Sequence, residues 1–422
     1  MSVWQRVVGR LTGRTATTQL ESVKALVRKS TASAHDDVTG AETRLRSLIK
    51  AASAPAAKQV GELQELRQSV ADLRQSVGGV RSSLTRLTSQ VELAQDPLFA
   101  AGRVHMLSLL EKIAARPGPL LVGPWTGEVG FELLYWIPFL RWVESRFALD
   151  PSRQLIVSRG GTASWYGVPE ERYAEVFSVV SGDEFRALTG DQRTLKQQGI
   201  DPFHGRIIEE LSRRRGQAMG VLHPSLMFKA FRQFWDDSAG YARVAEFTKY
   251  TLLTPPLADL PAGLPPGYVA VRFYFRRSFP DTPQNRAFAQ SVVSSLAERG
   301  PVVLLASGAR VDDHSDWLPE GIPNVTVVGA GPVERNLAVQ SAVIGGARAF
   351  VGTYGGYSYL APLYRVPTIA FYSRSRRRFD WSHLSAAERA FDEIGAAPMT
   401  VVPVRQTPLV HAALAAVGAQ PA

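Results

Sequence analysis

The segment Ala349-Phe-Val-Gly-Thr-Tyr-Gly-Gly-Tyr-Ser358 is the clearest structural unit in this sequence. Its apolar beginning predicts a buried strand, and Gly355 and Gly356 then allow the backbone to turn into a helix that runs to about Tyr364. A second apolar run, Thr368–Tyr372, follows after a short connection. A strand, a crossover helix and a second strand form the unit from which parallel sheets are built.

The same alternation of short apolar runs with longer amphipathic stretches extends along the chain from about residue 100. It predicts an α/β fold with two Rossmann-like domains. The boundary lies in Thr254–Gly267, because its five prolines can neither continue a helix nor enter a central strand. We therefore predict one domain at 100–254 and a second at 268–415. The expected strands are Leu120–Pro124, Gln154–Ser158, Val176–Val180 and Ala218–Leu222 in the first domain, and Tyr268–Phe275, Val302–Ser307, Val325–Val328, Ala349–Gly352, Thr368–Tyr372 and Thr400–Val404 in the second.

The first hundred residues differ in composition, since Trp4 is the only aromatic side chain before Phe99. We expect residues 1–57 to be helical fragments and linker with a basic amphipathic N-terminus, either an interfacial helix for anionic lipid or a frayed end. From Leu63 to Val91, apolar residues recur three and four positions apart, as in a coiled coil. Residues 58–96 are therefore predicted to form an N-terminal α-helical coiled coil that makes a homodimer. The alternative is a helix that lies along the protein's own body.

Composition excludes several classes of protein. The chain has 422 residues, of which 45% are hydrophobic and 20% charged, so it is not globally disordered. It has no cysteine, which excludes a disulfide framework, a thiolate metal site and a cysteine nucleophile. No apolar run approaches the ~20 residues that span a bilayer, and no signal peptide is visible. We therefore expect a cytoplasmic protein whose basic N-terminus contacts the inner membrane face peripherally.

The charge balance and the motif content narrow the partners further. A net charge of +10 favours anionic ligands. Nucleic acid is not expected, because the basic charge is dilute and lacks interleaved aromatic residues. The seven histidines lack metal-ligand spacing, and the sequence contains no P-loop, no dinucleotide-binding glycine motif at the first helix and no zinc-protease motif. No metal ion or other cofactor is therefore expected.

Ligands of open parallel sheets bind beyond the carboxyl ends of the strands, so the candidate residues are expected in the loops there. In the loop Gly123–Trp136, glycines including Gly127 permit a turn into a helix whose free N–H groups face an anion. Glu128 and Glu132 are four positions apart, which predicts that both carboxylates lie on one helix face as candidate general bases. The alternative is that both simply complement the helix dipole. His223, after the strand at Ala218–Leu222, is a further candidate for the cleft.

The second domain supplies the candidate anion-binding residues. Arg272 lies inside a strand that we expect to be buried, either as part of the site or as one member of a buried ion pair. Arg276 and Arg277 follow at the carboxyl end of that strand, where guanidinium forks suit a diphosphate; a solvated rim is the alternative. In the loop Gly352–Ser358, the N–H groups around Gly355 and Gly356 form a candidate anion site, with Thr353, Tyr357 and Ser358 beside them. The segment Asp312–Asp316, which includes His314, is interpreted as a solvated loop; the alternative is a position at the mouth of the cleft.

On these residues the chain resembles GT-B fold glycosyltransferases of the bacterial surface-glycan type. The segment Ala338–Ser373 is similar to the donor-binding end of heptosyltransferase-like members. Val271-Arg272 and Arg276-Arg277 are similar to the arginine motif of the fucosyltransferase-like group. The resemblance implies that a nucleotide sugar lies against the domain at 268–415, that the acceptor enters from the domain at 100–254, and that no metal is required.

Together these observations predict a metal-independent glycosyltransferase. It moves a sugar from a nucleotide-diphosphate sugar to a hydroxyl of a cell-surface glycan or of a lipid-linked precursor, with Glu128 as the base. Arg276, Arg277 and the N–H groups around Gly355–Ser358 are expected to hold the diphosphate, and Arg272 to organise the site from beneath. The alternative is a non-catalytic glycosyltransferase-like scaffold that oligomerises through its coiled coil.

Overall fold

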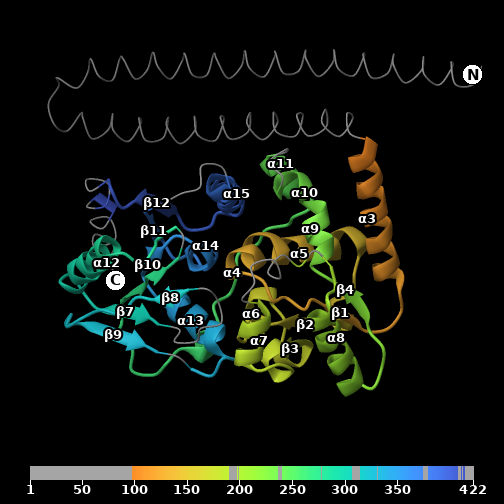
Figure 1. Cartoon of the computed structure of the whole chain (residues 1–422), viewed down its shortest axis with the longest axis horizontal. Helices are drawn as coiled ribbons and strands as arrows, with labels where there is room; N and C mark the ends of the chain where they lie inside the picture. Colours follow the sequence, from red (N-terminus) through yellow and green to blue (C-terminus); the bar gives the residue numbers. More distant parts are fainter. Residues whose placement is uncertain are drawn as a thin grey trace, which may run out of the picture. The chain divides into compact units, whose positions relative to one another are not determined.

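The computed structural model describes residues 97–189, 197, 199–235, 240–276, 278–306, 314–329, 331–373, 379–406, 410 and 412–413 (Figure 1). The predictions for residues 1–57 and 58–96, and the one for Arg277, lie outside these ranges. One compact unit consists of Met106–Ser238 and Val244–Ala422, and it contains every strand named below. A second unit consists of Met1–His105 with Ala239–Arg243.

A parallel four-stranded sheet forms the first half of the larger unit. Its strands are β1 (Leu120–Val122), β2 (Gln154–Ser158), β3 (Tyr173–Glu175) and β4 (Gly220–Leu222), in the order β3-β2-β1-β4. β1 lies between β2 and β4, with Val122 opposite both Ile156 and Leu222. Every residue of β1 and β2 is buried, because helices cover both faces, which explains their unbroken apolar runs.

Helices and turns connect these strands. After β1 the chain enters one continuous helical stretch made of α4 (Val129–Phe131), a π-helical turn η1 (Glu132–Trp136) and α5 (Ile137–Phe147). Pro202 occupies the first helical position of α8, and the Asp201 carboxylate accepts the His204 N–H at 2.8 Å, a standard N-terminal cap. The helical elements of this half include η2 (Pro151–Arg153), α6 (Ala163–Tyr166), η3 (Glu170–Arg172), η4 (Val176–Ser178), α7 (Gly182–Thr189), α8 (Pro202–Arg214), α9 (Ser225–Ala230) and α10 (Arg232–Trp235). The residues of α3 (Pro97–Ala115) and α11 (Tyr241–Glu246) are divided between the two units, and η5 (Leu257–Asp259) precedes the second sheet.

The predicted strand at Val176–Val180 is wrong. The strand is Tyr173–Glu175, and Val176–Ser178 forms a 3₁₀ turn instead. The Glu175 carboxylate accepts the Phe177 N–H at 3.2 Å and so starts the turn. Val176 and Phe177 are buried in the core of this half. Their apolar character therefore reflects the burial of a turn, which a short apolar run cannot distinguish from a strand.

The second half contains a six-stranded parallel sheet. Its strands are β5 (Val269–Arg272), β7 (Val302–Leu305), β9 (Val325–Val328), β10 (Ala349–Thr353), β11 (Thr368–Tyr372) and β12 (Met399–Pro403). They lie in the order β12-β11-β10-β5-β7-β9. After β5 the chain adds β7 and then β9 on one side of β5. It then crosses to the other side of β5, where it adds β10, β11 and β12 in turn. This is the Rossmann order, and its switch point lies between β5 and β10.

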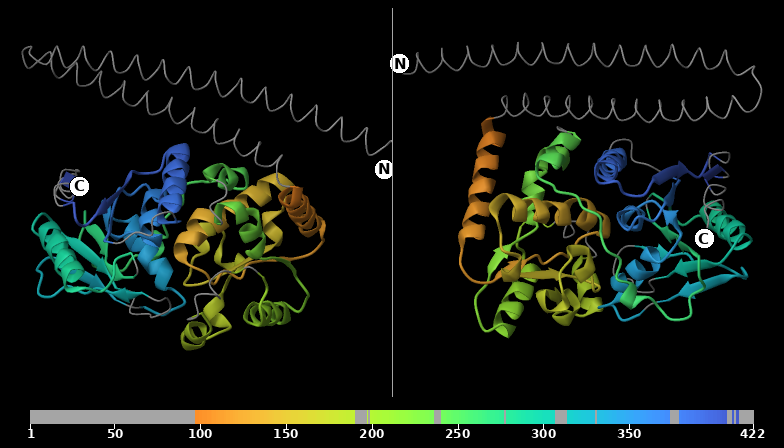
Figure 2. Two further views of the ribbon diagram at one scale, coloured as in Figure 1. Left: turned by 45° about the horizontal axis from the view of Figure 1, so that its top comes forward. Right: turned by 180° about the vertical axis from the view of Figure 1, so that it is seen from behind.

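Helices cover both faces of this second sheet, as Figure 2 shows from two further sides. Alternate residues of the central strands, such as Val271 and Val351, pack with α12 (Pro283–Ala297) in one core. α13 (Asn336–Gly345) and α14 (Gly356–Leu363) cover the other face, and α15 (Phe379–Ile394) precedes β12. The predicted run Tyr268–Phe275 divides after Arg272, because β6 (Tyr274–Phe275) pairs antiparallel with β8 (Ser315–Asp316).

The mixed α/β fold with parallel sheets agrees with the sequence analysis. The strands of the first sheet lie within residues 100–254 and those of the second within 268–415. Within the described residues, no helix combines the length and the apolar character that crossing a membrane would need.

Candidate functional site

A pocket lies at the carboxyl ends of strands from both sheets. On the first-sheet side it is lined by Glu128, Val129, Gly130, Arg159 and Gly160, from the loops after β1 and β2. On the second-sheet side it is lined by Arg272, Tyr274, Arg276, His314, Gly356 and Tyr357. Its empty space is about 710 Å³, a figure that includes open solvent at the mouth. The second-sheet residues surround the switch point between β5 and β10, where open α/β sheets bind ligands.

Glu128 and Arg276 join the two sides of this pocket. Glu128 is the N-terminal cap of α4 and has extended backbone angles, so its side chain departs before the helix begins. The two nitrogens of the Arg276 fork donate to the two oxygens of the Glu128 carboxylate, Nη2 to Oε1 at 2.6 Å and Nη1 to Oε2 at 3.1 Å. About a third of each side chain remains exposed, 29% for Arg276 and 33% for Glu128, so the pair faces the solvent of the pocket.

Arg272 forms the floor of the site. It is the last residue of β5 and is 6% exposed. Its Nη2 donates to Asp316 Oδ1 at 3.1 Å and its Nη1 to Gln340 Oε1 at 2.9 Å. The guanidinium also lies over the Tyr357 ring, 4.4 Å from the ring centre, a favourable cation–π contact. The buried ion pair that the sequence analysis gave as one role for Arg272 is therefore present, with Asp316 as the partner, and Arg272 also lines the pocket.

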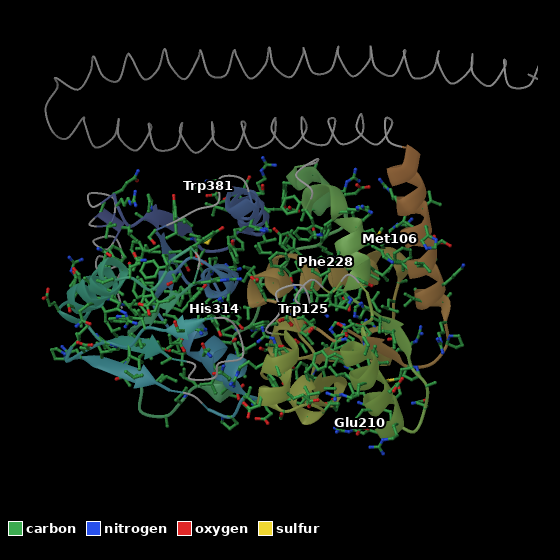
Figure 3. All side chains as sticks on the ribbon, in the orientation of Figure 1. Met106, Trp125, Glu210, Phe228, His314 and Trp381 are labelled. Atoms are coloured by element: carbon green, nitrogen blue, oxygen red, sulfur yellow. The ribbon has the colours of Figure 1, made fainter. Side chains whose placement is uncertain are left out.

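The interpretation of Asp312–Asp316 as a solvated loop is wrong for His314 and Asp316. Asp316 lies on β8 as the partner of Arg272, and only 12% of its side chain is exposed. His314, labelled in Figure 3, lines the pocket, and its ring centre is 4.6 Å from that of Tyr274. A buried arginine on a strand needs a carboxylate, which was the available signal for Asp316.

The start of α14 brings backbone N–H groups to the same pocket. A Cβ atom added to Gly355 would lie 1.9 Å from the Tyr274 hydroxyl, and one added to Gly356 would lie 2.8 Å from Val129 Cγ1. Both positions therefore require glycine because of close approach, and Gly356 brings the start of α14 against the start of α4. Free N–H groups in the first turn of a helix attract anions, and the helix dipole adds to that attraction.

Thr353 and Ser358 have structural partners instead of pocket positions. The Thr353 hydroxyl accepts the Tyr274 N–H and donates to the Tyr274 carbonyl, both at 3.1 Å, and so ties β10 to β6. The Ser358 hydroxyl accepts the Gly355 N–H at 3.0 Å and donates to the Gly355 carbonyl at 2.6 Å. Ser358 therefore shapes the glycine turn, and Thr353 joins two strands. Neither side chain lines the pocket.

Glu132 occupies a different environment from Glu128, so the expectation of one shared helix face is wrong. Glu128 precedes the helix, whereas Glu132 begins the π-helical turn and is completely buried. Ser158 Oγ and the Tyr166 hydroxyl each donate to Glu132 Oε1 at 2.6 Å, and Oε2 has no hydrogen-bond partner. Burial raises the pKa of Glu132 to about 7, against the lowering effect of the two hydroxyl donors. The Glu132 carboxylate thus links η1 to the end of β2 and to α6 inside the first half.

Arg159 is a pocket residue that the sequence analysis missed. It follows β2 directly and is 3% exposed, yet it lines the pocket. Its Nη2 donates to the Gly127 carbonyl at 2.9 Å and thereby holds the loop that carries Glu128. The available signal was its position at the carboxyl end of a correctly predicted strand, just before two glycines.

His223 lies outside the pocket. It is buried beside His204, with its Nε2 3.3 Å from His204 Nδ1, while its Nδ1 accepts the Ser225 N–H at 3.1 Å. Burial lowers the pKa of His223 to about 3, so the imidazole is neutral. His204 in turn contacts the Thr126 hydroxyl at 2.9 Å. His223 therefore belongs to a buried network behind the loop after β1.

Comparisons with known proteins add a structural resemblance. No family model matches the sequence, and no curated protein matches it. The ADP-heptose lipopolysaccharide heptosyltransferase II of E. coli matches with a TM-score of 0.39 and 11% identity, over 71% of this chain and 98% of that chain. A glycosyl transferase of family 9 from Veillonella parvula matches with a TM-score of 0.37 and 10% identity, over 72% and 90%. The iron-containing heptosyltransferase TibC matches with a TM-score of 0.33 and 12% identity, over 62% of this chain and 60% of that chain.

The solved structures that this chain is similar to thus include heptosyltransferases and a family 9 glycosyltransferase.

Proposed function

We propose that this protein is a glycosyltransferase that moves a sugar from a nucleotide-diphosphate sugar to a hydroxyl of a cell-surface glycan or glycolipid precursor. One observation carries the proposal. A single pocket holds a carboxylate from the first-sheet side, and arginines and a helix N-terminus from the second-sheet side.

The second-sheet side suits the diphosphate. The Arg276 fork can bind two phosphate oxygens at once, and the N–H groups at the start of α14, an eight-residue helix, can bind further oxygens. Arg272 supports this arrangement from below through Tyr357 and Asp316. These groups supply the positive charge that a departing diphosphate requires, so the proposed reaction needs no metal ion.

The transfer itself exchanges one bond for another. The bond between the anomeric carbon of the sugar and the diphosphate oxygen breaks, and its electron pair leaves with the nucleoside diphosphate. A bond forms between the anomeric carbon and the acceptor oxygen, whose proton passes to the Glu128 carboxylate. The acceptor enters from the first-sheet side, where Glu128 and Arg159 line the pocket.

The test combines binding with transfer. The full-length protein is titrated calorimetrically with UDP-, GDP-, ADP- and CMP-sugars, and transfer to glycolipid extracts is followed with a labelled donor. We expect at least one donor to bind and to be transferred, and Glu128→Gln to abolish transfer while binding persists. Asp281→Asn is the matched control, because Asp281 pairs with Arg286 on the exposed surface, away from the pocket. If no donor binds, the proposal fails; binding without transfer favours the non-catalytic scaffold.

The homodimer through residues 58–96, the cytoplasmic location and the contact of the N-terminus with the inner membrane face remain proposals. Light scattering of the full chain and of a chain lacking residues 1–96 tests the dimer: the full chain is expected at twice its monomer mass. Co-sedimentation with vesicles containing anionic lipid tests the membrane contact.

A further inference from the structure

The ion pair between Glu128 and Arg276 poses a problem for the proposed reaction. The two residues are 148 positions apart, and both oxygens of the carboxylate face both terminal nitrogens of the guanidinium. Arg276 needs those nitrogens for phosphate oxygens, and Glu128 needs an oxygen for the acceptor hydroxyl. Yet the two groups are each other's hydrogen-bond partners.

Carboxylate and phosphate compete for the same guanidinium fork. Each presents two oxygens at a spacing that matches the paired N–H donors of arginine. The pair is partly exposed, so water and ligand can reach it from the pocket. Tyr274 and His314 line the pocket nearby, and neither carries a negative charge that could take the place of Glu128.

We infer that Glu128 is an internal competitor for the diphosphate at Arg276, and that donor binding releases Glu128 toward the acceptor. This inference rests on the proposed function. A diphosphate displaces the carboxylate because it can bind the Arg276 fork with one phosphoryl group and the N–H groups at Gly356 with the other. Glu128 thereby makes the site select ligands with two linked phosphoryl groups, and it becomes available as a base only when the donor is present.

The strength of the competition follows from the exposure of the pair. A partly exposed ion pair changes an equilibrium by about fivefold at most. Removing the Glu128 charge should therefore tighten diphosphate binding by up to about fivefold, provided that the ligand uses the Arg276 fork.

The experiment measures inorganic pyrophosphate binding by isothermal titration at constant ionic strength. Four proteins are compared: wild type, Glu128→Gln, Arg276→Ala, and the double variant. We expect Glu128→Gln to bind pyrophosphate more tightly than wild type, by up to about fivefold, and the same substitution to have no effect in the Arg276→Ala background. Asp281→Asn removes one negative charge from an exposed pair outside the pocket and should leave the affinity unchanged.

Each other outcome has a definite meaning. Equal or weaker pyrophosphate binding by Glu128→Gln overturns the inference and leaves the anion site of the proposed function intact. Equal tightening by Asp281→Asn, or tightening that persists without Arg276, shows a general charge effect and also overturns it. If wild type binds no pyrophosphate, the inference fails, whereas the proposed function still depends on the titrations with nucleotide sugars.

Discussion

Replacing Glu132 with glutamine should remove a loss of stability that the wild-type protein suffers as the pH rises. The Glu132 carboxyl is completely buried, and its Oε2 has no hydrogen-bond partner. Burial raises its pKa from the ordinary 4.5 to about 7. The folded protein therefore holds this proton more tightly than the unfolded chain does. Stability is fully present below about pH 4.5 and falls as the pH rises toward 7.

The size of the effect follows from that difference in pKa. The interval from 4.5 to about 7 corresponds to about 3.4 kcal/mol of unfolding free energy at full titration. Between pH 5 and pH 8 the folded and unfolded titrations together give about 2.5 kcal/mol. Glutamine keeps the shape and has no proton to lose, so this part of the pH dependence should disappear.

The assay is urea unfolding followed by tryptophan fluorescence at pH 5, 6, 7 and 8. The unfolding free energy of Glu132→Gln, relative to wild type, should rise by about 2.5 kcal/mol across this range. Ser158→Ala is the matched control, because it removes a donor to Glu132 but leaves the titrating group in place. Its stability should still fall with pH, at least as steeply as that of wild type. Parallel curves for wild type and Glu132→Gln would refute the reasoning.

Three further predictions concern other parts of the site and its surroundings. Gly356→Ala places a methyl group 2.8 Å from Val129 Cγ1 and should cost about 1–3 kcal/mol of unfolding free energy, measured in urea, and weaken donor binding. Asp316→Asn removes the carboxylate from the buried Arg272 and should cost about 3 kcal/mol in the same assay. His383 lies on α15, and burial lowers its pKa to about 3. The folded protein therefore binds this proton less tightly than the unfolded chain does, and it loses stability as the pH falls below 6.5. His383→Phe should therefore spare about 3 kcal/mol of the loss between pH 6.5 and pH 4.

Each of these three has a contradicting result. Unchanged donor affinity and stability in Gly356→Ala would mean that the two helix starts do not approach closely. A change below about 0.5 kcal/mol in Asp316→Asn would mean that Arg272 is not buried with its partner. An acid unfolding curve of His383→Phe that coincides with that of wild type would mean that the imidazole is already solvated.

The sheets were largely predictable because most strands are buried on both faces. Gln154–Ser158 and Thr368–Tyr372 have the bounds expected from the sequence, and the three central residues of each strand are apolar. The error at Val176–Val180 arose because a buried 3₁₀ turn has the same composition as a strand. The division of Tyr268–Phe275 arose because β8 pairs with its end, a contact between distant segments that local sequence does not reveal.

The candidate site was predictable in position but only partly in residues. Parallel topology places loops at the carboxyl ends of strands together, so Glu128, Arg276 and Gly356 were singled out from sequence and line one pocket. Arg159 was missed because a single arginine after a strand has no motif. Spacing alone could not show that Glu132 is buried, since Glu128 is the extended cap residue before the helix and its side chain lines the pocket.

The central claim is that guanidinium and backbone N–H groups of the second-sheet side bind a nucleoside diphosphate. Isothermal titration of UDP, GDP and ADP into wild type and Arg276→Ala tests it directly. We predict that at least one of the three binds to wild type and that Arg276→Ala weakens this binding by about tenfold or more, as expected for the loss of charge-assisted hydrogen bonds. Undetectable binding of all three, or equal affinity in both proteins, would contradict the claim.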